Sequence, residues 1–228
     1  MTRLGREAAS ALAGTGLLAI FCDLEARWHE EYRDWLREEM FPARLAVGFR
    51  RCASYDLLPG EGDDRSSSAP PFLTLYEAPS VADLYGQPYQ ALRENRSERD
   101  RAFHDRMMGT ERYTLAAAGP SPGGGQGGGL APFVFVDRFD LRPEAVEGFS
   151  IWFENEYAPW CAKAPGFVRL RRYLAMEGAP RHFVLHEFGE EAFAQSSLWR
   201  ALRQEGRWAS CAMTHGSPGL YRLAEGAP

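Results

Sequence analysis

Histidine, tyrosine and glutamate side chains in the second half of the chain have the types and spacing that proton transfer requires. His182 and His186 alternate with apolar residues in HFVLHE, which places both on the same face of a predicted strand. His186 is suited to act as a general acid or base because imidazole titrates near neutral pH. Tyr173 could orient a substrate oxygen, and Glu156 lies on the apolar stripe of a predicted helix, where burial raises a carboxyl pKa. We therefore predict His186, Tyr173 and Glu156 as the catalytic residues.

A further set of aromatic and charged side chains is predicted to contact a substrate. The set consists of Tyr55, Tyr76, Trp152, Tyr157 and Arg172. Tyr76 takes the place of His186 in the first half, so both matched positions hold a residue that can transfer a proton. Each prediction has a structural alternative, since buried tyrosines and tryptophans are common packing residues and buried histidines and carboxylates are often only hydrogen-bonded in place. The arginine could equally lie in solvent at a strand edge.

Metal and cofactor sites find no support in the sequence. His182 and His186 are four strand residues apart, about 13 Å, which is too far for both to bind one metal ion. The cysteines have no CxxC spacing and are expected to be reduced thiols; they are Cys22, Cys52, Cys161 and Cys211. A Ser-His-Asp order, a phosphate loop, a dinucleotide fingerprint and an HExxH motif are all absent from the sequence. We expect no metal and no cofactor, and we predict solvated positions for His29, His104 and His215.

Composition and charge narrow the possible partners. The 228 residues carry a net charge of −5 and 13% aromatic residues, without the basic stripe of a nucleic-acid-binding protein. The apolar stretch GLLAIF is too short to cross a bilayer, and the segment before it carries Arg3, Arg6 and Glu7 and does not fit a signal peptide. We predict a cytoplasmic protein that binds a small molecule and neither nucleic acid nor a membrane.

The chain contains the same series of motifs twice, on either side of a linker rich in glycine and proline. WLREEMFPARLAVGFRRCASY, residues 35–55, matches WFENEYAPWCAKAPGFVRLRRY, residues 152–173, in its Trp, Glu, Pro, Gly-Phe and Tyr. The intervening GPSPGGGQGGGLAP has no apolar face to bury and is predicted to be flexible. The predicted boundaries are a tail at 1–14, a first repeat at 15–118, a linker at 119–130 and a second repeat at 131–228.

Each half is predicted to have the order βαββαβ. The apolar runs LLAIFCDL and VFVDRFDL form the first strands, and a helix with an aromatic stripe follows each; Pro42 and Pro159 lie where an interior proline breaks or kinks a helix. The second strands are RRCASYDL in the first half and VRLRRYLAM in the second, and the third strands are FLTLYE and HFVLHE. The second helices are PYQALREN and LWRALRQE, and the fourth strands are ERYTLA and GLYRLA. This is the ferredoxin-like unit, whose sheet has one bare face. The predicted fold class is therefore α+β: two ferredoxin-like repeats packed sheet to sheet, as an intramolecular dimeric α+β barrel.

The repeated motif resembles the EthD-like branch of the dimeric α+β barrel superfamily, whose pattern is Trp-aromatic-x-x-Glu-His-x-Pro followed by Pro-Gly-Phe and a strand ending in Arg-Arg-Tyr. The second half matches this pattern at Trp152, Phe153, Glu156, Pro159, Pro165, Gly166, Phe167, Arg172 and Tyr173. The first half keeps Trp35, Glu39, Pro42, Arg44, Gly48, Phe49 and Tyr55 and lacks the proline before Gly48. The histidine of the pattern is replaced by Met40 and by Tyr157, so any role that it has in relatives is absent here.

The resemblance implies several functions, because the superfamily includes cofactor-independent monooxygenases, lactone isomerases, polyketide cyclases, dehydratases and haem enzymes. Together with the residues above, it predicts a cofactor-independent enzyme of the lyase, isomerase or cyclase type that acts by proton transfer on a hydrophobic carbonyl or aromatic, polyketide-like substrate. The alternatives are a non-catalytic binding or structural barrel, and a haem-binding barrel. We expect a monomer that acts as a pseudo-dimer, or a homodimer. Since the halves differ at Tyr76 and His186, we expect the second half to hold the better-formed pocket.

Overall fold

The computed structural model describes residues 14–58, 69–119, 130–194, 196–197, 199, 212–215 and 217–227. Most of the predicted linker, 120–129, lies outside these residues, and so does most of the predicted helix at 198–205, of which only Trp199 is described. The predicted flexibility of the linker therefore stays a prediction.

The first half alternates strands and helices in the predicted order. Its strands are β1 (Gly16–Asp23), β2 (Arg51–Leu57), β3 (Phe72–Ala78) and β4 (Met108–Ala117). Its longer helices are α1 (His29–Trp35), α2 (Phe41–Ala46), α3 (Gln87–Glu94) and α4 (Glu98–Arg106), with short helical segments η1 (Ala26–Trp28), η2 (Leu36–Met40) and η4 (Val81–Leu84). Ser97 caps α4 because its hydroxyl accepts a hydrogen bond from the amide of Asp100.

The second half repeats this arrangement where it is described. Its strands are β5 (Phe133–Leu141), β6 (Phe167–Ala175), β7 (His182–Phe188), β8 (Ala212–His215) and β9 (Gly219–Ala227). Its helical segments are η5 (Pro143–Ala145), α5 (Val146–Trp152), η6 (Phe153–Tyr157), α6 (Ala158–Cys161) and α7 (Glu191–Ala194). Within the described residues, every helix is too short or too polar for a membrane span.

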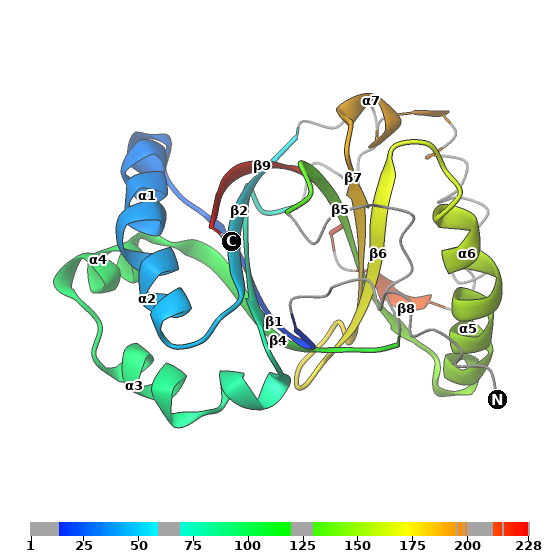
Figure 1. Ribbon diagram of the computed structural model, residues 1–228, viewed down its shortest axis with the longest axis horizontal. Coiled ribbons are helices and arrows are strands. Elements are labelled where there is room, and N and C mark those ends of the chain that lie inside the picture. Colours follow the sequence, from blue (N-terminus) through cyan, green and yellow to red (C-terminus); the bar gives the residue numbers. More distant parts are fainter. Residues whose placement is uncertain are drawn as a thin grey trace, which may run out of the picture.

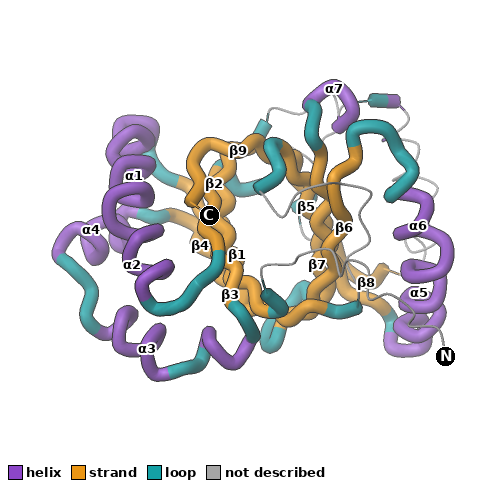
Figure 2. The backbone as a smooth tube through the Cα atoms, viewed as in Figure 1, coloured by secondary structure: helices purple, strands orange, loops and turns teal. Residues whose placement is uncertain are grey.

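The strands form one closed antiparallel barrel. The order in the first half is β4-β1-β3-β2 and that in the second is β9-β5-β7-β6, while β8 pairs with the far end of β5. The halves join at two seams, where the end of β4 pairs with β6 and β9 pairs with β2. Figure 1 shows the strands between α1–α4 on one side and α5 and α6 on the other, and Figure 2 shows the strands as a ring with the helices outside it. The predicted fold class is confirmed.

Where both faces of the barrel wall are covered, a strand is apolar on both faces, as β1 shows. In β1, Leu17, Ala19 and Phe21 belong to the core inside the barrel, while Leu18 and Cys22 belong to the core under the helices of the first half. A third core lies under the helices of the second half. The molecule therefore has three apolar layers, one inside the barrel and one under each set of helices.

The two prolines of the repeated motif do not end their helices. Pro42 and Pro159 each follow a five-residue π-helical segment, η2 and η6, and the chain then continues as α2 and α6. A proline has no amide hydrogen and its ring presses on the carbonyl four residues earlier, and the wider π turn accommodates both effects. The helix break or kink that was predicted at each proline is therefore a π turn.

Candidate functional site

A cavity of about 390 Å³ lies between the sheet and the helices of the first half. Its apolar wall is largely aromatic and includes Tyr32 and Trp35 from α1, Tyr76 from β3 and Tyr89 from α3. Its polar wall includes side chains of η2, α2, α4 and β4. A cavity of this size, with an aromatic wall beside polar and charged groups, is typical of a small-molecule site.

An aspartate and a histidine one helical turn apart form part of this wall. Nδ1 of His104 donates a hydrogen bond to the carbonyl oxygen of Asp100, 2.9 Å away, and lies 2.9 Å from its carboxylate oxygen Oδ1. Both neighbours of Nδ1 are acceptors, so in the neutral ring this nitrogen carries the proton and the lone pair is on Nε2. His104 is therefore in the tautomer that a general base at Nε2 requires.

The ionised form of Asp100 is favoured although the residue is buried. Burial by itself would raise its pKa, but the hydrogen bond from His104 and the charges of Arg96 and Arg44 hold that pKa below its ordinary value. The Ser97 hydroxyl, which receives the Asp100 amide, donates in turn to Glu39 on η2. This chain of bonds ties the start of α4 to the π turn of the first helix.

The cavity wall also supplies neutral hydroxyl groups. The phenol oxygen of Tyr32 lies 3.1 Å from Oγ1 of Thr74, and both residues line the cavity together with Tyr76. Loss of solvation raises the pKa of Tyr32 and of Tyr76 above the ordinary phenol value. These phenols stay protonated at neutral pH and can donate a hydrogen bond to a ligand oxygen.

The structure does not bring His186, Tyr173 and Glu156 together, which corrects the predicted catalytic group. Tyr173 pairs with Phe183 across the β6–β7 ladder, three residues from His186, and an odd offset places the two side chains on opposite faces of the sheet. His186 belongs to the side covered by helices, Tyr173 to the core inside the barrel, and Glu156 is exposed on η6. To act together on one substrate, the three side chains would have to lie on the same face of the sheet.

His186 itself is enclosed by aromatic rings. It is 2% exposed, its Nε2 lies 2.8 Å from the hydroxyl of Tyr157, and its ring centroid is 4.7 Å from that of Trp199. Trp152 stacks on Tyr157 at 4.9 Å between centroids, so these two predicted binding residues pack with the histidine. Arg172 covers the rings of Phe149 and Phe153 in the same layer.

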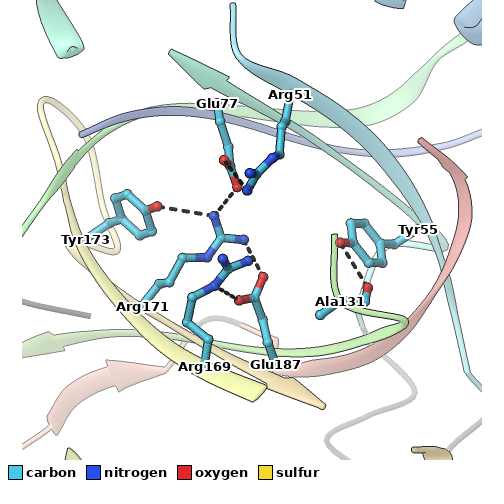
Figure 3. Close-up of polar contacts among 8 residues, drawn as sticks. All are labelled: Arg51, Tyr55, Glu77, Ala131, Arg169, Arg171, Tyr173 and Glu187. Carbon is cyan, nitrogen blue, oxygen red and sulfur yellow. Dashed lines mark hydrogen bonds and ion pairs between the residues drawn. The ribbon is translucent and has the colours of Figure 1, made fainter. Parts of the chain in front are cut away.

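Tyr55 and Tyr173 lie inside the barrel, beside a buried ion network (Figure 3). Arg171 contacts Glu77 of the first half and donates to Glu187, at 2.6 Å, of the second. It also lies 3.4 Å from the hydroxyl of Tyr173, whereas Tyr55 donates to the carbonyl of Ala131. Tyr76 is thus the predicted binding residue that lines the cavity of the first half.

This cavity lies wholly within the first half, whereas the better-formed pocket was expected in the second. The two halves can be aligned on Pro42 and Pro159 and on the third strands. In this alignment Met40 corresponds to Tyr157, Tyr76 to His186 and Tyr89 to Trp199. The larger rings of Tyr157 and Trp199 pack directly on His186. In the described part of the second half, these rings occupy the space that stays open in the first.

Sequence reasoning missed Asp100 and His104, and predicted a solvated position for His104. The missed signal is their spacing of four on a helix whose start is marked by Ser97, because residues i and i+4 share one face. That spacing alone leaves open whether the face meets solvent or a cavity. The structure shows that it meets the cavity.

Comparison with known proteins supports the fold. The sequence matches no protein-family model and no curated protein. Among solved structures, an anthrone oxidase-like protein is 13% identical, with a TM-score of 0.60 and coverage of 96% of this chain and 94% of that one. A candidate monooxygenase from Fusobacterium nucleatum is 7% identical, with a TM-score of 0.59 and coverage of 93% and 94%.

A mutant chlorite dismutase from Candidatus Nitrospira defluvii, in complex with cyanide, is 15% identical, with a TM-score of 0.61 and coverage of 96% of this chain and 95% of that one. These neighbours have the dimeric α+β barrel fold. At such low identities the likeness shows the fold alone.

Proposed function

We propose that this chain binds a small hydrophobic carbonyl compound in the cavity of the first half and moves a proton on it without a bound cofactor. The observation that carries the proposal is the Asp100–His104 pair in the wall of an aromatic cavity of about 390 Å³. A cavity supplies the binding energy for an apolar ring system, and a histidine with a fixed tautomer supplies the base.

The chemistry follows from the positions of the donors and acceptors. Nε2 of His104 takes a proton from the carbon next to the substrate carbonyl, and the electron pair of that C–H bond moves to form an enolate. A neutral phenol, from Tyr32 or Tyr76, donates a hydrogen bond to the enolate oxygen. Return of the proton from His104 to another carbon gives isomerisation, and loss of a neighbouring leaving group gives a lyase reaction.

The fold neighbours are compatible with this substrate class. One is an anthrone oxidase-like protein and another a candidate monooxygenase, and the first name points to an aromatic ketone. We also infer that the two halves are a tandem duplication of an EthD-like unit, with the boundaries given above. The shared Trp, Glu, Pro, Gly-Phe and Tyr of residues 35–55 and 152–173 support that inference.

Deuterium exchange into 2-tetralone, an aromatic ketone with acidic hydrogens next to its carbonyl, tests the proposal. The protein in D2O is expected to speed the exchange above the buffer rate, as followed by proton NMR. The variant His104→Gln should lose about 10²- to 10⁴-fold of the enzymatic rate. His29→Gln changes a histidine of the same half that does not line the cavity, and should keep the rate.

Other outcomes would favour the alternatives. Binding of 2-tetralone without exchange would indicate a binding protein rather than an enzyme. A large rate loss in a folded His186→Gln variant, with His104→Gln unaffected, would restore the site predicted from sequence. A Soret band in the purified protein would indicate the haem-binding alternative, in which His104 would be the residue of this cavity that holds the haem.

A further inference from the structure

Two buried donors in the cavity wall have no hydrogen-bond acceptor among the described residues. They are Nε1 of Trp35 and Nε of Arg44, in side chains that are 1% and 6% exposed. Buried polar groups in folded proteins are nearly always hydrogen-bonded, because an unpaired one keeps the whole cost of its lost hydration. Both residues line the cavity, so an acceptor oxygen of a bound ligand would satisfy these donors once the side chains turn toward it.

The charge of the cavity wall points to an anion. Its cationic residues outnumber its two carboxylates, Glu39 and Asp100; the cations are Arg44, Arg93, Arg96 and Arg112. The whole chain, by contrast, has a net charge of −5. A cavity that gathers arginines in an acidic protein attracts negatively charged molecules.

Arg44 differs from the buried Arg138, Arg169 and Arg171 in its partners, and it resembles Arg172, which also makes no ion pair with a described residue. Arg169 and Arg171 pair with carboxylates, whereas Arg44 makes no ion pair with any described residue. Its guanidinium lies 4.3 Å from the ring centroid of Tyr76, and its Nη1 lies 3.4 Å from both the carbonyl oxygen and the sulfur of Met40. These weak contacts orient the group, and its charge is offset only beyond ion-pair distance, by Asp100, whose pKa it helps to lower.

The second half shows that the fold itself does not require a cation here. Arg44 comes two residues after Pro42, and the residue two after Pro159 is Cys161, a buried thiol. The half without the arginine has its matching space filled by Tyr157 and Trp199. Cation and cavity therefore occur together in one half.

We propose that Arg44 and Trp35 form an anion subsite that binds the carboxylate of an aromatic carboxylic acid. The charged guanidinium and the indole N–H meet the carboxylate oxygens, and the rings of Tyr32, Tyr76 and Tyr89 enclose the aromatic part of the ligand. This inference rests on the proposed function for the location of the site and adds the substrate class. It does not depend on the proton-transfer step.

Calorimetric titration with two probes of nearly equal shape tests the subsite. 2-Naphthoate carries the carboxylate, and 2-naphthamide is its neutral counterpart. In the wild-type protein we expect naphthoate to bind roughly tenfold or more tightly than naphthamide, as for a buried charge-assisted hydrogen bond. In Arg44→Met this preference should disappear while naphthamide still binds.

Two further variants keep the result interpretable. Arg99→Met also removes one positive charge from the first half, from an ion pair with Glu38 away from the cavity, and should keep the preference. Arg44→Lys preserves the charge but loses the planar donors, and should restore part of the preference. It also serves as the test if Arg44→Met melts before the titration temperature.

The outcomes separate this inference from the proposed function. Equal binding of both probes by the wild-type protein, or an unchanged preference in Arg44→Met, would overturn the anion subsite. The 2-tetralone exchange assay would then still report on the proposed function, because its substrate is neutral. If neither probe binds, the anion subsite is wrong. The deuterium exchange assay with 2-tetralone then decides the proposed function by itself.

Discussion

Nδ1 of His104 lies 2.9 Å from Oδ1 of Asp100, one turn earlier on α4, and both side chains line the cavity of the first half. The carboxylate and the carbonyl of the same aspartate both face this nitrogen, so its proton is held there. The lone pair at Nε2 is the structural basis of the proposed chemistry.

Nitrogen-15 NMR of the imidazole therefore should detect the tautomer with the proton on Nδ1. At about pH 8, where an ordinary histidine is neutral, we expect a protonated-type shift for Nδ1 and an unprotonated-type shift for Nε2. His104→Gln identifies the signals by their loss. A neutral His104 with its proton on Nε2 would contradict the assignment of that nitrogen as a base.

The buried ion network should stabilise the contact between the two halves. Arg171 joins Glu77 of β3 to Glu187 of β7, so Arg171→Met leaves two buried carboxylates without this partner. We expect a loss of about 3–5 kcal/mol in the free energy of unfolding, measured by urea denaturation. Arg99→Met breaks a partly exposed pair with Glu38 and should cost less than about 1 kcal/mol. Equal losses in both variants would show that the network contributes no more than a surface pair.

His182 should make the protein less stable in mild acid. Burial, followed by the charge of Arg172, lowers the pKa of this histidine from 6.5 to about 4. As the pH falls from 6.5 to about 4, the unfolded chain takes up a proton that the folded protein does not, so stability is lost in this range. Between about pH 7 and pH 5, His182→Gln should lose less unfolding free energy than the wild type, as measured by urea denaturation. An equal loss in both would exclude His182 as a source of the acid sensitivity.

Much of the fold could be predicted because the signals are periodic and occur twice. Alternation of apolar residues marks the strands, and the repeated Trp, Glu, Pro and Gly-Phe align the halves without any knowledge of their contacts. Each half leaves one apolar face of its sheet uncovered, so the two sheets are expected to pack against each other. The π turns at Pro42 and Pro159 were less predictable, because a proline can end, kink or widen a helix and the surrounding packing decides which.

The site was harder to predict because it depends on register and volume. His186 and Tyr173 both lie on strands, but only the β6–β7 register shows that they face opposite sides of the sheet. The cavity exists where Met40 and Tyr89 leave space that Tyr157 and Trp199 fill in the other half, and differences in side-chain volume become visible only after packing.

Filling the cavity tests the central claim, that the small-molecule site lies in the first half. Ala43 lines the cavity on α2, so a large side chain at this position takes up cavity volume. Ala46→Trp, at an exposed position of the same helix, is the matched control. The measurement is the rate of deuterium exchange into 2-tetralone by folded protein. We predict that Ala43→Trp loses the enzymatic exchange and that Ala46→Trp keeps it; wild-type exchange in a folded Ala43→Trp variant would contradict the account.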